Sequence, residues 1–301
     1  MRVFVTGATG AIGRHAVPAL LAAGHTVSAL ARTPTRAAEL EARGARPEAV
    51  SLFDRQGLAR AFAGHEAVVN LATAIPPTSR FMRRSAWAEN QRIRTEGSAA
   101  VVDAALSAGV ERLVQESVAM VYPDRGAEWI DESVPPDRYP MAEGNLAAEA
   151  SARRFTEAGG RGVVLRLGWF HGLGAAHSQE LIALARRHVA TMIGRPDGFV
   201  SSIHVADGGT AVAEALAAPA GVWNVVDDEP LTKRAFADAL GAAVGVTPWV
   251  RVPGRAALLL GDRTTSLTRS LRVSNRQFRA ATGWAPRYPS AREGLASMVA
   301  A

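Results

Sequence analysis

"VFVTGATGAIGRH", residues 3–15, is the stretch of sequence that decides the fold. An apolar run ends at Thr6, and glycines follow at positions 7, 10 and 13, where a helical pattern begins. Glycine serves three purposes in such a loop: a tight turn, close approach of the backbone to a pyrophosphate, and close packing of a helix on a strand. The first amides of the helix add donors and the positive end of a dipole. We therefore expect a dinucleotide to be held by the residues of this loop: Thr6, Gly7, Thr9, Gly10, Ala11, Ile12 and Gly13.

Outward from this loop, short apolar runs alternate with helical patterns. The runs are "TVSALA" at 26–31, "AVVNLAT" at 67–73, "RLVQES" at 112–117, "GVVLRLGWF" at 162–170 and "GVWNVV" at 221–226. Such alternation is typical of a parallel sheet with right-handed crossovers. We expect an α/β fold, a Rossmann-type doubly wound parallel sheet with a smaller C-terminal substrate-binding lobe. The expected dinucleotide-binding domain is 1–170 with 204–226 returning to it, and the expected lobe is 171–203 with 227–301.

Composition narrows the class of protein. The 301 residues include no cysteine, which excludes disulfides, thiolate catalysis and cysteine metal sites. The seven histidines fit no metal-site spacing, so no metal is expected. The formal net charge is +6, but the arginines are dispersed and only "FMRRSAW" at 81–87 is a tight basic and aromatic group, which does not favour a nucleic-acid partner. No apolar run approaches the length of a membrane span, so we expect a soluble, cytoplasmic protein without a cleaved signal.

The end of the second apolar run bears on the choice of cofactor. Arg32 stands where NAD-binding proteins of this kind usually carry an acid for the ribose hydroxyls. An arginine there would pair instead with a 2′-phosphate, and Arg36 and Arg14 could bind the same phosphate. The sequence therefore favours NADP(H) over NAD(H), with surface charge as the alternative reading of Arg36.

Further motifs give the chain a resemblance to the short-chain dehydrogenase/reductase superfamily, of the extended or atypical kind that includes the NAD-dependent epimerase/dehydratases. They include "AVVNLAT" at 67–73, "GVERLVQESVAMVYP" at 109–123, "VVLRLGWFHGLG" at 163–174 and "SSIHVADGGTAV" at 201–212. The resemblance implies cofactor contacts from two groups, Leu71, Ala72 and Thr73 on one side and Leu167, Gly168 and Trp169 beside the nicotinamide. It also implies a small-molecule substrate and a possible homodimer through helices near 90–108 and 143–158.

The same resemblance implies a catalytic tyrosine, a lysine four residues later that lowers its pKa, and a serine or threonine that binds the substrate oxygen. Here the only lysine is Lys233, and the residue four before it is not tyrosine. With Glu132 and Glu149 as anchors, the family pattern puts Met141 at the tyrosine and Asn145 at the lysine. Counting back four residues from Tyr122 puts Val118 at the serine. Asn145 keeps the capacity to hydrogen-bond a ribose hydroxyl, whereas valine and methionine side chains transfer no proton.

Other residues near the expected pocket are candidates for the acid or base. They are Glu116, Tyr122, Tyr139 and His171, and the expected substrate contacts are Ser117, Val118 and Met141. Alternatives stay open for three of the four: Glu116 as a structural acid paired with an arginine, Tyr139 as a loop aromatic or substrate contact, and His171 as a solvated loop residue.

We expect an NADP(H)-dependent oxidoreductase or epimerase-like enzyme that acts on a small hydroxylated or carbonyl substrate with a non-standard proton donor. One alternative is a non-redox enzyme on the same fold, such as a dehydratase, cyclase or isomerase. The other is an NADP-sensing regulatory protein.

Overall fold

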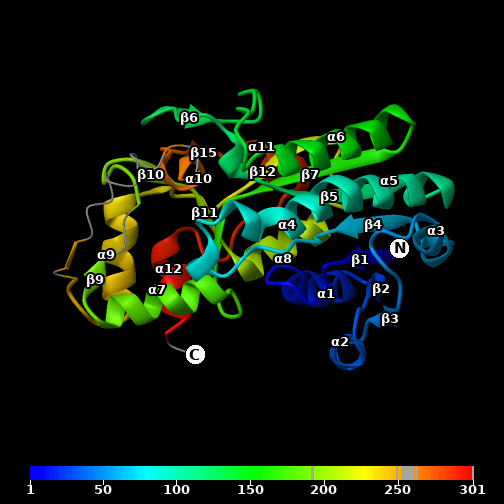
Figure 1. The fold of residues 1–301 in the computed structure, drawn as a ribbon, viewed down its shortest axis with the longest axis horizontal. Helices are drawn as coiled ribbons and strands as arrows, with labels where there is room; N and C mark the ends of the chain where they lie inside the picture. The colour runs from blue at the N-terminus through cyan, green and yellow to red at the C-terminus, as the bar shows by residue number, and fades with distance from the viewer. Residues whose placement is uncertain (191–192, 249, 252–260, 262–263, 300–301) are drawn as a thin grey trace.

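A seven-stranded parallel sheet forms the centre of the molecule (Figure 1). The structure is a computed structural model that describes residues 1–190, 193–248, 250–251, 261 and 264–299. The strand order is β3-β2-β1-β4-β5-β7-β12, and every neighbouring pair is parallel. The strands are β1 (Arg2–Thr6), β2 (Thr26–Leu30), β3 (Arg46–Glu48), β4 (Ala67–Asn70), β5 (Arg112–Val118), β7 (Arg161–Leu167) and β12 (Gly221–Val225). The expected Rossmann-type doubly wound sheet is confirmed.

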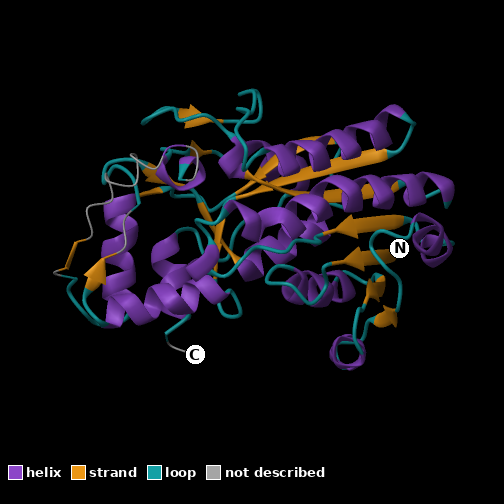
Figure 2. Cartoon of the chain, in the orientation of Figure 1, coloured by secondary structure: helices purple, strands orange, loops and turns teal. Residues whose placement is uncertain are grey.

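Helices cover both faces of this sheet (Figure 2). One face carries α1 (Gly13–Ala22), α2 (Pro34–Glu41), α8 (Val205–Glu214) and α11 (Arg276–Thr282), which pack on inward-facing strand residues such as Val3 and Val5. The other face carries α3 (Arg55–Phe62), α4 (Ala88–Arg92), α5 (Ser98–Ser107) and α6 (Glu143–Glu157), around Phe4 and Phe155. The central strands are apolar on both faces because both are covered.

The stretch from α4 to α5 is one helix interrupted by a π-helical turn, η3 (Ile93–Gly97). A π turn inserts one extra residue into the helix, and such turns occur frequently at functional sites. The short 3-10 turns η1 (Thr78–Arg80) and η2 (Arg84–Trp87) precede it, and η4 (Ala119–Val121) follows β5.

A second group of elements lies beside the carboxyl edge of the sheet, at the left of Figure 1. Its apolar core joins α7 (Ala176–Arg186), α9 (Lys233–Ala243) and α12 (Ala291–Ser297) through residues such as Ile182, Leu240 and Leu295. Three short strand pairs lie beside these helices: β8 (Trp169–His171) with β11 (Ser202–His204), β10 (Phe199–Val200) with β13 (Leu231–Thr232), and β9 (Val189–Ala190) with β14 (Val250–Arg251). A fourth pair, β6 (Trp129–Ile130) with β15 (Arg272–Val273), packs in a separate apolar cluster with Tyr122, and α10 (Thr265–Thr268) precedes β15.

The division into a domain at 1–170 with 204–226 and a lobe at 171–203 with 227–301 stays a proposal. Positions 191–192, 249, 252–260, 262–263 and 300–301 of that lobe lie outside the described residues. Among the described helices, none is both long and apolar enough to cross a membrane.

Candidate functional site

The glycine loop after β1 has the geometry that its sequence predicts. Gly7 has φ of +69°, and a Cβ added to it would collide with the carbonyl group of Leu71 at the end of β4. A Cβ on Gly13 would collide with the Gly7 carbonyl oxygen. A Cβ on Gly10 would meet only that oxygen, at 3.1 Å. Gly7 and Gly13 are thus required by the protein's own packing, whereas Gly10 leaves space above the loop for a ligand.

A cavity of about 470 Å³ opens above this loop at the carboxyl edge of the sheet. Half of its lining was expected from the sequence: Thr6, Gly7, Thr9, Gly10, Arg32, Arg36, Leu71, Ala72 and Thr73. The other half was missed: Leu30, Ala31, Ala49, Val50, Ser51, Leu52, Phe53, Glu89 and Ile93. Most of the missed residues end β2 or follow β3, so the rule that ligands bind beyond the carboxyl ends of parallel strands would have found them. Ala11 and Ile12 do not line the cavity, and Ile12 instead packs against Gly208 of α8.

Two arginines stand at the rim of the cavity. Arg32 follows β2, and Arg36 lies in the first turn of α2, whose N-cap Thr33 accepts a hydrogen bond from the Arg36 amide. Both side chains are exposed, and neither has an ion-pair partner among the described residues. Arg14 lies elsewhere, against Gly174 in the loop after β8. The pair at positions 32 and 36 is therefore available to an anionic ligand, and Arg14 does not join it.

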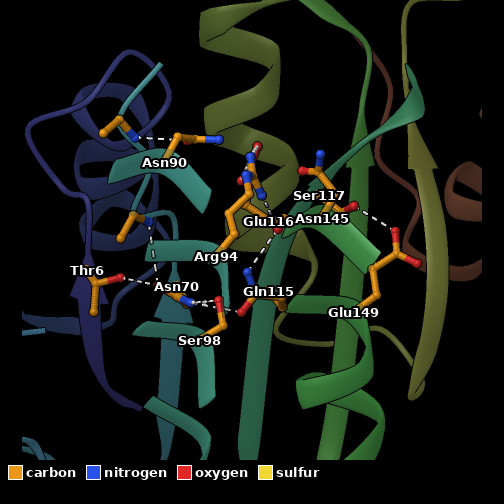
Figure 3. A network of polar contacts seen from close by, with 12 residues as sticks. Thr6, Asn70, Asn90, Arg94, Ser98, Gln115, Glu116, Ser117, Asn145 and Glu149 are labelled. Carbon is orange, nitrogen blue, oxygen red and sulfur yellow. Dashed lines mark hydrogen bonds and ion pairs between the residues drawn. The ribbon is translucent and has the colours of Figure 1, made fainter. Parts of the chain in front are cut away.

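A chain of buried polar groups fixes the strand ends beneath the cavity (Figure 3). The Thr6 hydroxyl donates to Asn70 Oδ1 at 2.5 Å, and Asn70 Nδ2 donates to Gln115 Oε1 at 2.8 Å. Next to them, the Ala74 amide donates to Asn90 Oδ1 at 3.0 Å, which ties the segment after β4 to α4. These bonds join β1, β4 and β5 to one another, so buried side chains as well as the sheet hold the strand ends together beneath the cavity.

Glu116 has an ion-pair partner that the sequence did not reveal. Arg94, on the π turn η3, points toward Glu116 in Figure 3 and lies 2.7 Å from its Oε2. Both side chains are buried. Burial raises the pKa of the Glu116 carboxyl, and the Arg94 guanidinium opposes that rise. The structure therefore favours the structural alternative for Glu116, a carboxylate that ties η3 to β5.

Ser117 and Tyr122 belong to a second buried chain, on the other side of β5. The Ser117 hydroxyl donates to Glu149 Oε1 at 2.6 Å, and Arg166 of β7 forms a bidentate pair with the same carboxylate. The Arg166 guanidinium lies over the Tyr122 ring. The Tyr122 hydroxyl donates to Asn224 Oδ1 at 2.8 Å. Tyr122 and Ser117 are fully buried in this chain, so their expected contacts with a substrate are not supported.

Tyr139 also has a structural partner. Its hydroxyl donates to the Met120 carbonyl oxygen at 2.8 Å, and the Arg269 guanidinium covers its ring at 4.4 Å. Burial, more than any other cause, raises its pKa to about 12. A tyrosine with this pKa is a poor base near neutral pH. The geometry favours the plain loop aromatic among the alternatives.

His171 lies in the interior and not at the cavity. The residue is 1% exposed, and Gly294 of α12 packs directly against its ring. The His204 ring lies 5.5 Å away between centroids, and neither nitrogen of His171 has a hydrogen-bond partner. Burial lowers its pKa to about 3, so the ring is neutral. The expected acid or base role would need contact with solvent or substrate, which this burial does not provide.

The three positions that the family pattern assigns to proton transfer lie together at the start of α6 and the end of β5. Val118 and Met141 pack in one apolar cluster with Val121, Tyr139 and Ala142. Asn145 is 8% exposed, and its Oδ1 has no hydrogen-bond partner. A buried amide oxygen without a partner is costly unless a ligand supplies a donor.

The residues expected beside the nicotinamide lie at the end of β7 and the start of β8. Leu167 is buried in the core, the Gly168 amide donates to the Val225 carbonyl oxygen, and the Trp169 ring packs edge-on against His177. None of these three residues lines the cavity, and neither does Asn145, so their expected contacts with the cofactor stay predictions.

Comparisons with known proteins agree with this geometry. The sequence profile of the NAD dependent epimerase/dehydratase family matches residues 3–225. The chain is 35% identical to a "3-diazoavenalumate denitrifying reductase" of Streptomyces sp, over 98% of this chain and 99% of that one. It is 31% identical to a "4-hydroxy-2-methyl-3-oxo-4-farnesyl-3,4-dihydroquinoline-1-oxide ketoreductase" of Stigmatella aurantiaca, over 90% and 82%. Among solved structures, the human epimerase family protein SDR39U1 (isoform 2) with NADPH superposes with a TM-score of 0.84 at 26% identity, over 100% and 99% of the two chains.

Proposed function

The chain belongs to the NAD-dependent epimerase/dehydratase family, within the short-chain dehydrogenases/reductases of the atypical kind, and from this premise we propose that it is an NADP(H)-dependent reductase of a small molecule. The observation that carries the proposal is the cavity above the glycine loop, with two unpaired arginines at its rim. Two relatives are named as reductases, one of a diazo compound and one of a ketone, and the human structure is named with NADPH. The names of the two reductases thus support reduction as the proposed activity, and the human structure supports NADPH as the proposed cofactor.

Each part of the cavity would hold one part of the cofactor. The loop at Gly10 and the first amides of α1 would hold the pyrophosphate, which is the usual use of a helix N-terminus. Arg32 and Arg36 would pair with the 2′-phosphate of NADP(H). Asn145 Oδ1 would accept a hydrogen bond from a ribose hydroxyl. The cofactor, when bound, supplies the hydride, and the protein's task is to place the substrate against it.

We also propose that the usual proton-transfer residues are replaced in this chain. Val118, Met141 and Asn145 would occupy the positions of the usual serine, tyrosine and lysine. The only lysine of the chain, Lys233, is bound to other groups. Lys233 Nζ donates to the carbonyl oxygens of Ile193 and Leu267, at 2.7 and 2.6 Å, within the lobe. No catalytic proton transfer is assigned to Glu116, Tyr122, Tyr139 or His171, because each of them is buried and most are engaged elsewhere. The homodimer and the cytoplasmic location stay predictions.

Gly10→Val tests the cofactor site, because the new Cβ would lie 3.1 Å from the Gly7 carbonyl oxygen and meet no other group, so its side chain would take up space above the loop. We expect the dissociation constant of NADPH, measured by titration calorimetry, to rise at least about 100-fold, which corresponds to about 2.8 kcal/mol. The matched control is Ala22→Val, which also introduces a valine but at the exposed far end of α1 and should leave NADPH binding within about twofold. Unchanged binding in Gly10→Val would remove the assigned site.

Turnover separates the reductase from the two other readings. With NADPH carrying deuterium at the transferred position of C4, a reductase yields deuterated product. A non-redox enzyme would form product without any nicotinamide. A sensor would bind NADPH tightly and turn over none of the acceptors tested.

A further inference from the structure

Hydride acceptors fall into two chemical groups that make different demands on a protein. A carbonyl that accepts hydride becomes an alkoxide, a strong base that must take up a proton before the product is neutral. A cationic acceptor is neutralised by the hydride itself. For an arenediazonium ion, the new C–H bond forms with the hydride pair, the C–N bond breaks, and its electron pair leaves with dinitrogen. The cofactor is oxidised, the acceptor carbon is reduced, and no proton enters the balance.

Proton donors beside the expected hydride position are committed to other partners. The Ser117 hydroxyl donates to the Glu149 carboxylate, and the Tyr139 hydroxyl donates to a backbone carbonyl oxygen. Glu116, the nearest acid on β5, is held by the Arg94 guanidinium. Glu143, in the first turn of α6, is exposed and lies about 200° around the helix from the buried Asn145, so it faces solvent. Within the part of the chain that the structure describes, no acid at the end of β5 or on the buried face of the first turn of α6 is therefore free to deliver a proton.

The end of β5 and the segment just before α6 are apolar at the positions where the family pattern has hydroxyl groups. Val118, Met141 and Leu146 pack against one apolar cluster, and their side chains carry no hydrogen-bond donor. An alkoxide next to these apolar side chains would lose its hydration without gaining a hydrogen bond, which is unfavourable. An oxyanion needs donors placed at the position of the developing charge, and a site that lacks them gives up the largest part of the usual rate enhancement for carbonyl chemistry. A reaction that forms no oxyanion loses nothing there.

We propose that the hydride acceptor of this protein is a cationic electrophile of the arenediazonium kind, which takes hydride at carbon without a proton. The inference rests on the proposed NADP(H)-dependent reductase and specifies its substrate class. In this reaction, Val118 and Met141 shield the acceptor carbon from water, which would otherwise compete with hydride for the electrophile. Asn145 orients the ribose and with it the nicotinamide.

An acidic group on the remote end of the acceptor suits the surface near the site. The segment between the cavity residues Thr73 and Glu89 contains Arg80, Arg83 and Arg84, all exposed. None of the three has an ion-pair partner among the described residues. A carboxylate on the acceptor would be attracted to this segment, and we therefore choose carboxylated probes.

The test compares two probes of matched shape and charge outside the reacting group. Benzenediazonium-4-carboxylate needs hydride alone, and 4-acetylbenzoate needs hydride and a proton. NADPH oxidation is followed with the purified full-length protein near pH 6.5, and the rate without protein is subtracted. We expect turnover of the diazonium probe to benzoate, with deuterium from labelled NADPH at the carbon that carried nitrogen. We expect turnover of the ketone to be at least about 100-fold slower, the contribution usually made by a general acid.

The solvent isotope effect gives a second readout on the wild-type protein. For the diazonium probe, turnover in D₂O should equal turnover in H₂O, and deuterated NADPH should slow it. Faster turnover of the ketone, or a solvent effect on the diazonium probe, would overturn the substrate class and leave the reductase proposal intact. If NADPH does not bind at all, the proposed function itself fails, and calorimetry without a probe reports that separately.

A variant restores the donors. In Val118→Ser/Met141→Tyr/Asn145→Lys, the ratio of ketone to diazonium turnover should rise by roughly 10²-fold, because a general acid aids only the reaction that needs one. An unchanged ratio in a variant that still binds NADPH would contradict the reasoning. The wild-type comparison stands even if this variant does not fold.

Discussion

Replacement of Arg32 should separate NADPH from NADH. Arg32 and Arg36 line the cavity, are exposed, and have no ion-pair partner among the described residues. A hydrogen bond to a charged group contributes about 1.5–3 kcal/mol, which corresponds to roughly 10- to 150-fold in a dissociation constant. Because the guanidinium is exposed and salt screens it, we take the lower end of that range at physiological ionic strength. Arg32→Ala should therefore weaken NADPH roughly 10- to 30-fold.

NADH provides the internal comparison, since it lacks the 2′-phosphate. Its dissociation constant should change less than about threefold in Arg32→Ala, because only the phosphate contact is removed. Both cofactors are titrated by calorimetry against wild type and variant. Arg46→Ala is the matched control: this side chain is 78% exposed, pairs with Glu48 in β3 and does not line the cavity. Equal weakening of NADPH and NADH in Arg32→Ala, or none of either, would refute the assignment of the phosphate site.

Three further predictions concern buried groups. Glu116→Gln leaves the Arg94 charge unpaired, so urea titration should show a loss of about 3 kcal/mol in the free energy of unfolding, with no change in the pH dependence of kcat. Tyr139→Phe should cost about 1 kcal/mol, for the hydrogen bond to the Met120 carbonyl, and should also leave the pH profile of kcat unchanged. The pKa of His171 is lowered from 6.5 to about 3, so between these values the unfolded chain binds more protons and stability falls as the pH falls. His171→Phe should reduce the slope of unfolding free energy against pH there by up to about 1.4 kcal/mol per pH unit.

Much of the fold and of the cofactor cavity could be predicted from the sequence because both depend on neighbours along the chain. The glycines at positions 7, 10 and 13 follow β1 directly, and Arg32 follows β2 directly. In a parallel sheet, residues that follow strands gather at one edge, so the spacing along the chain is enough to place them. The lining residues after β3 were missed because that strand has three residues and gives only a weak apolar pattern.

The partners of the buried groups could not be predicted in this way. Arg94 lies 22 positions before Glu116 and contacts it from a π turn. No residue pattern in the helix predicts that turn. His171 was expected at the pocket because its motif follows β7. The structure places it in β8, paired with β11, where Gly294 of a helix more than 120 positions later covers the ring. Such contacts depend on the tertiary arrangement and not on local spacing.

Helix α6 is attached to the sheet by residues other than Asn145, the position that the family pattern assigns to the catalytic lysine. Its buried face is held by Glu149, which pairs with Arg166 of β7 and accepts the hydrogen bond from Ser117 of β5, and by Phe155 in the core. Asn145 lies one turn earlier, and its Oδ1 contributes to none of these contacts. The residues that attach the helix to the sheet are therefore different from Asn145, which we propose to face the cofactor. In the proposed site, a replacement at Asn145 would change which acceptors are reduced at little cost to folding. A broken contact at Glu149 would leave a buried arginine unpaired, whereas a change at Asn145 would not.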